Sequence, residues 1–172
     1  WNGGDGKSPA HFCAWSKYML GFLQPERMHS KTGVSLQSAS LYPTAHMYWD
    51  GMTDGEYFLV ENRTKSGFDN SINISPGIII YHIDEKSNNN DLDTWSHPVV
   101  KIEEADGNDS LGLQDVVSDP GDVWNSGSGI VGGFRDQTGK QASNAMSYQT
   151  HYYNRSNDPA SYSYITLDNF SA

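Results

Sequence analysis

The residues of this sequence that could do chemistry are carboxylates and histidines, and one strand-like run carries one of each. The run GIIIYHID, residues 77–84, ends with His82 and Asp84. Alternate side chains of an extended chain share a face, so Ile78, Ile80, His82 and Asp84 line one side. This pair is either part of a catalytic or metal site or a structural end to the strand. We expect the structural role, in which the histidine donates to a carbonyl or carboxylate, because the pair alone supplies no mechanism.

The histidines do not form the local motif of a zinc hydrolase. That motif commonly places two histidines one helical turn apart with a glutamate between them. No two of the six histidines are four residues apart: they are His11, His29, His46, His82, His97 and His151. The GSG at 127–129 lacks the strand that precedes a serine hydrolase nucleophile. Phosphate-binding and dinucleotide-binding motifs are also missing from the sequence.

Acidic and amide side chains gather in three segments: DEKSNNNDLD at 84–93, ADGNDS at 105–110 and SDPGD at 118–122. Calcium takes oxygen ligands of this kind, usually from loops. We expect one calcium ion to be held by Asp84, Asp106, Asp119 and Asp122. Carboxylates brought together without a cation repel, and a metal orders a long loop that has few apolar anchors. The alternative is that these segments are solvated turns, which use the same residue types.

One helix is predicted near the N-terminus, within KSPAHFCAWSKYMLGF. Ser8 has the type and position of an N-cap, Pro9 of a first helical residue and Gly21 of a helix end. Large apolar residues recur at helical spacing: Phe12, Trp15, Met19 and Phe22 or Leu23. We expect this stripe to be the buried face of the helix, covered by another part of the structure.

After Gln24 the apolar period changes to two, which is typical of antiparallel strands separated by turns. The predicted strands are residues 33–39, 44–49, 56–62, 77–84, 99–104 and 162–167. Residues 106–155 are rich in Gly, Ser and Asp, so long loops are expected there. The predicted fold class is therefore mainly β: one N-terminal α-helix followed by an antiparallel β-sandwich-like domain with long loops.

Composition and charge exclude some classes of protein. The chain has 172 residues, and its 11 Lys and Arg against 21 Asp and Glu give a net charge of -10, so a basic face for nucleic acid is missing. No run has the length of a membrane span, so no membrane partner is expected. The sequence opens on Trp1 without an initiator methionine, and we interpret it as a piece of a longer protein.

Several motifs together resemble one family. In chain order they are AHFCAWSKYMLGFLQP, EYFLVENR, GFDNSINISPGIIIYHID, HPVVKIEEADG and DPGDVW. This series, across about residues 8–125, resembles the segment C-terminal to the zinc site in the immune inhibitor A family of secreted bacterial zinc metalloproteases. YSYITLDNFS is similar to the closing strand of that region.

The resemblance implies a chain that accompanies a catalytic domain. In the family, a zinc-binding helix of pattern H-E-x-x-H-x-x-G-x-x-D comes earlier and has no counterpart here, so no catalytic residue is assigned and zinc belongs to the parent enzyme. Residues 1–24 would be the last part of the catalytic domain and residues 25–172 a β-rich domain. The implied partners are the N-terminal catalytic portion and the protein substrates of a secreted, extracellular endopeptidase.

Two other interpretations stay open on the sequence alone. The first is an acidic β-sandwich that binds carbohydrate or protein, with Trp49, Trp95 and Trp124 as exposed stacking platforms. The second is a structural role, in which the aromatic residues are core and the chain connects domains.

Overall fold

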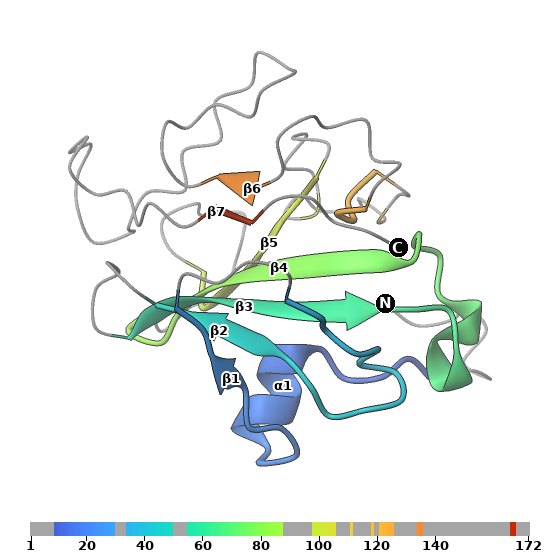
Figure 1. Ribbon diagram of the computed structural model, residues 1–172, viewed down its shortest axis with the longest axis horizontal. Helices are drawn as coiled ribbons and strands as arrows, with labels where there is room; N and C mark the ends of the chain where they lie inside the picture. The colour runs from blue at the N-terminus through green and yellow to red at the C-terminus, as the bar shows by residue number, and fades with distance from the viewer. Residues whose placement is uncertain are drawn as a thin grey trace.

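A five-stranded sheet forms the centre of the computed structural model (Figure 1). The elements in chain order are α1 Ala14–Met19, β1 Glu26–Arg27, β2 His46–Tyr48, β3 Glu56–Arg63, the 3-10 helix η1 Gly67–Ser71, β4 Gly77–Asp84, β5 Val100–Glu103, β6 Phe134–Arg135 and β7 Thr166–Leu167. The structure describes residues 9–29, 34–49, 55–87, 98–105, 111, 118, 121–125, 134–135 and 166–167. The prediction of a mainly β chain with one helix near the N-terminus is confirmed.

The sheet has the strand order β1-β2-β3-β4-β5, and β6 pairs with β7 in a second, two-stranded sheet. The longest pair is β3 with β4, which run antiparallel with Phe58 opposite His82. β1 departs from the antiparallel prediction, because it pairs with β2 in parallel. Residues 28–45 connect these two strands, which run in the same direction.

The apolar pattern places most strands correctly. The bounds of β4 agree with the prediction, and β2, β3 and β5 lie within a residue or two of it. The prediction of a strand at 33–39 is wrong for its described residues, in which Ser38 makes an isolated bridge to Asn62. Of the predicted strand at 162–167, Thr166–Leu167 is β7 and the rest lies outside the described residues.

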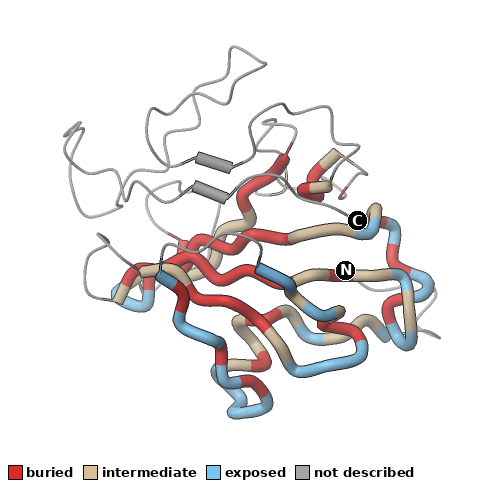
Figure 2. Tube along the Cα trace, viewed as in Figure 1, coloured by how far each residue is buried: buried red, intermediate tan, exposed pale blue. Residues whose placement is uncertain are grey.

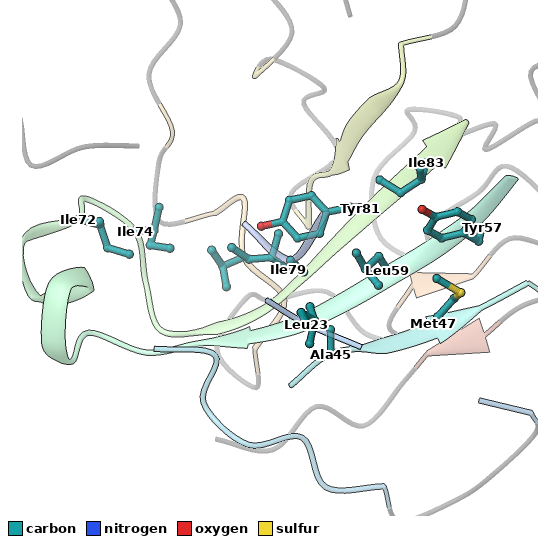
Figure 3. Close-up of a cluster of buried hydrophobic side chains, with 12 residues drawn as sticks. Leu23, Ala45, Met47, Tyr57, Leu59, Ile72, Ile74, Ile79, Tyr81 and Ile83 are labelled. Carbon is teal, nitrogen blue, oxygen red and sulfur yellow. The ribbon is translucent and has the colours of Figure 1, made fainter. Parts of the chain in front are cut away.

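Both faces of the sheet are covered, so seven of the eight residues of β3 are buried (Figure 2). The larger core lies on the face that α1 covers, and Figure 3 shows Leu59, Ile79 and Tyr81 together there. The smaller core, on the opposite face, includes Phe58, Ile80 and Trp124. Because both faces are buried, polar residues in these strands must find partners inside the protein.

The helix begins later than predicted and is therefore shorter. α1 begins at Ala14, after Cys13 in an extended conformation, whereas Pro9 was expected as its first residue; Ser8 lies outside the described residues. The predicted end at Gly21 is confirmed: Gly21 has φ 77°, and the Phe22 N–H donates to the Lys17 carbonyl at 2.8 Å.

Gly77 is a position where the fold leaves no room for a side chain. A Cβ there would lie 2.6 Å from the Trp124 carbonyl oxygen and 2.6 Å from Val123 Cγ1. We expect Gly77→Ala to lower the free energy of unfolding by about 2 kcal/mol, measured in urea, because backbone must move to admit the methyl group. Gly21→Ala is the control for positive φ without crowding, since its Cβ meets nothing within 4 Å. A Gly77→Ala protein with the wild-type urea midpoint would contradict this prediction.

Candidate functional site

Two of the four predicted calcium ligands lie in the described part of the chain. Asp84 and Asp122 are both buried, and Asp84 Oδ1 accepts a hydrogen bond from the Lys86 N–H at 2.9 Å. Asp106 and Asp119 lie outside the described residues. Among the described residues, no group of three or more His, Cys, Asp or Glu side chains is arranged to hold a metal ion. The calcium site therefore stays a prediction.

His82 lies between two buried carboxylates from the neighbouring strands. Its Nε2 is 2.8 Å from Glu56 Oε1 on β3, and its Nδ1 is 3.3 Å from Glu103 Oε1 on β5. Burial alone lowers the pKa of the imidazole, but hydrogen bonds and charge from Glu103 and Glu56 outweigh it and raise the pKa to about 9. At neutral pH His82 is thus a cation that joins three strands, in agreement with the structural role expected for it.

A second set of buried polar groups lies between α1 and the sheet. We call it the polar cluster, and its members are Lys17, Glu61, Arg63, Asp69 and Tyr81. Arg63 Nε is 3.4 Å from Glu61 Oε1 and 3.5 Å from Asp69 Oδ2. Glu61 also accepts a hydrogen bond from the Tyr81 hydroxyl at 2.5 Å. Glu61 and Arg63 are two residues apart on β3 and so share a face of the strand, whereas Asp69 and Lys17 come from distant segments.

The polar cluster holds the residues before α1 through their backbone. The N–H of His11 donates to Asp69 Oδ1 at 2.8 Å, and Arg63 Nη2 donates to the carbonyls of His11 and Phe12 at 3.2 and 2.9 Å. These bonds fix an extended segment where a helical turn was predicted. They explain why α1 begins late.

Lys17 anchors α1 itself. Its Nζ donates to the Ala39 carbonyl at 2.9 Å, and burial lowers the pKa of the ammonium group while the nearby Glu61 raises it. Ala14 and Lys17 are the buried residues of the helix. The predicted buried stripe is wrong for Phe12 and Met19, which are exposed, because a lysine occupies the face that packs on the sheet.

Four large apolar residues in and beside α1 are exposed, and we call them the outer apolar surface: Phe12 before the helix, Met19 at its end, and Leu20 and Phe22 after it, which are 59, 57, 56 and 64% exposed. Trp15 is half-buried, and Leu23, after the helix, is buried in the larger core. Large exposed apolar residues grouped on one element mark an interaction site. The outer apolar surface is the candidate functional site, and sequence periodicity found its residues but not the direction in which they point.

The tryptophans do not match the predicted stacking platforms. Trp124 is buried, and its Nε1 donates to the Glu103 carbonyl at 2.7 Å, so its assignment as an exposed platform is wrong. Trp49 is half-buried against the larger core, with the guanidinium of Arg27 5.1 Å from its ring centre. Trp95 lies outside the described residues.

Comparisons with known proteins leave the chain without an assigned family: no family model, no curated protein and no solved structure matches it. Within the described residues, no helix has the length and apolar character needed to cross a bilayer.

Proposed function

We propose that this chain is the portion of a secreted zinc metalloendopeptidase that follows the zinc-binding helix, and that it supports the catalytic portion without cleaving peptides itself. The motifs that carry the family resemblance form α1, β3, β4 and β5. In this proposal residues 1–24 end the catalytic domain and residues 25–172 form the β-rich domain.

The outer apolar surface is the observation that carries the proposal. A short helix that buries a lysine, with four large apolar side chains exposed at its end and in the residues beside it, is expected of a segment that is covered on its outer side. The catalytic portion of the same polypeptide is the proposed cover. A net charge of -10 disfavours the association of two copies of this chain through the same surface.

Two experiments test the proposed function directly. The coding sequence upstream of Trp1 is expected to encode the H-E-x-x-H pattern, and the purified chain with added zinc is expected to leave casein intact. An upstream sequence without zinc ligands, or zinc-dependent cleavage by this chain alone, would overturn the proposal.

Phe22→Asp tests the outer apolar surface. In the purified chain we expect a change in unfolding free energy within about 0.5 kcal/mol, because Phe22 is mostly exposed. In the full-length enzyme we expect a loss of about tenfold or more in activity, since a charge would be buried against the catalytic portion. Val34→Asp, at another exposed apolar residue, is the matched control and should preserve activity. Equal activities of the two variants would exclude this surface as the docking site.

The proposal also includes calcium, as a structural ion that Asp84, Asp106, Asp119 and Asp122 hold. The acidic and amide residues of the three segments described in the sequence support it, because calcium takes oxygen ligands of this kind. We expect calcium at about 100 times its Kd to raise the free energy of unfolding by about 2.7 kcal/mol, measured as an increase in Tm that a chelator reverses. Magnesium at the same concentration is the control, and a Tm that calcium leaves unchanged would exclude the site.

A further inference from the structure

We infer that residues 9–22, which include α1 and which we call the α1 strap, open and close as a unit while the five-stranded sheet stays folded. This motion is independent of the proposed function. It follows from how the strap is held: by a few polar contacts and by apolar side chains that are mostly only partly buried.

The strap buries a smaller share of its own residues than the strands beneath it. The buried residues of α1 are Ala14 and Lys17. Four other residues of the strap are only partly buried against the larger core: Ala10, Cys13, Trp15 and Tyr18. All residues of β3 except Asn62 are buried. Because stabilisation by burial scales with the apolar area removed from water, we expect the strap to be attached more weakly than the strands beneath it.

Polar contacts hold the closed strap against the sheet, and we call these contacts the latch. Asp69 and Arg63 hold the backbone of His11 and Phe12, and Lys17 holds the Ala39 carbonyl. When the strap opens, water reaches these groups and replaces the lost hydrogen bonds, so each bond contributes only about 1 to 3 kcal/mol net. Such contacts fix the position of the strap without preventing its release.

The C-terminal end of the strap provides a hinge. Gly21 has a positive φ of 77° and no neighbouring atom within 4 Å of its Cβ position, whereas Leu23 is buried in the larger core. Rotation near Gly21 therefore releases α1 while Leu23 remains in place. A six-residue helix is marginal by itself, so the released strap also loses its helical hydrogen bonds.

Hydrogen exchange of the wild-type chain is the first test. The Lys17 and Leu20 amides, which donate to the Cys13 and Ser16 carbonyls, report on the closed strap. We expect their protection factors to be at least about 100-fold below those of the β3–β4 ladder. Equal protection would mean that the strap opens only with global unfolding, which would overturn the inference.

Asp69→Asn tests the latch, and Glu85→Gln, which alters the hydrogen bond from Tyr57 on the same sheet, is the matched control. We expect Asp69→Asn to speed strap exchange and alkylation of Cys13, the only cysteine, about tenfold, with ladder exchange unchanged. Glu85→Gln should leave the strap as it is. Equal acceleration of strap and ladder by Asp69→Asn, or no acceleration of either, would refute the latch.

Discussion

Replacement of Arg63 by methionine is expected to lower the free energy of unfolding by about 3–5 kcal/mol. The guanidinium is nearly fully buried and lies 3.4 and 3.5 Å from the carboxylates of Glu61 and Asp69. Methionine fills a similar volume but supplies no charge, so both carboxylates remain inside the protein without their main counter-ion. The substitution also removes the hydrogen bonds to the backbone before α1.

Urea unfolding of Arg63→Met against Lys65→Met measures this effect. Lys65 is exposed and two residues away, so its substitution should change stability by less than about 0.5 kcal/mol. Adding Glu61→Gln to Arg63→Met should recover part of the loss, because one of the uncompensated charges is removed. A loss below about 1 kcal/mol for Arg63→Met would show that the polar cluster does not depend on this cation.

Raising the pH from 6 to 10 is expected to remove about 3 kcal/mol of stability through His82. Its pKa rises from 6.5 to about 9 in the folded chain, since the carboxylates of Glu103 and Glu56 outweigh the effect of burial. Below pH 6.5 the folded and unfolded states are both protonated, and the stabilisation is fully present. As the pH rises, the unfolded state loses its proton first, so stability falls until the folded state titrates near pH 9.

Unfolding free energies at a series of pH values measure the slope, and the imidazole resonances of His82 measure its pKa directly in the wild-type chain. His82→Gln serves as the comparison, because it keeps hydrogen-bonding capacity and cannot titrate. Its stability should vary less between pH 6.5 and 9 than that of the wild type. An imidazole that titrates at or below its ordinary pKa, or identical pH profiles for both proteins, would contradict the assignment.

Local sequence pattern predicted the longer strands of this chain but not β1. GIIIYHID and EYFLVENR are bounded by turn residues and rich in β-branched or aromatic side chains, and both form strands close to the predicted bounds. β1, with two residues, has no such pattern, because its place beside β2 depends on backbone pairing across a long connection. The bridge at Ser38 likewise depends on Asn62 and not on its own segment.

At the candidate site, local sequence pattern did not predict which side chains face the sheet. The sequence alone determined the mainly β class, the end of the helical turn before Gly21 and the presence of large apolar residues in and beside the helix. The tertiary structure decided that Lys17 faces the sheet, that Phe12 and Phe22 face outward and that His82 lies between Glu56 and Glu103. Helical spacing fixes which residues share a face, but the direction of that face follows from hydrogen bonds to Asp69, Ala39 and Arg63, which the chain brings together only on folding.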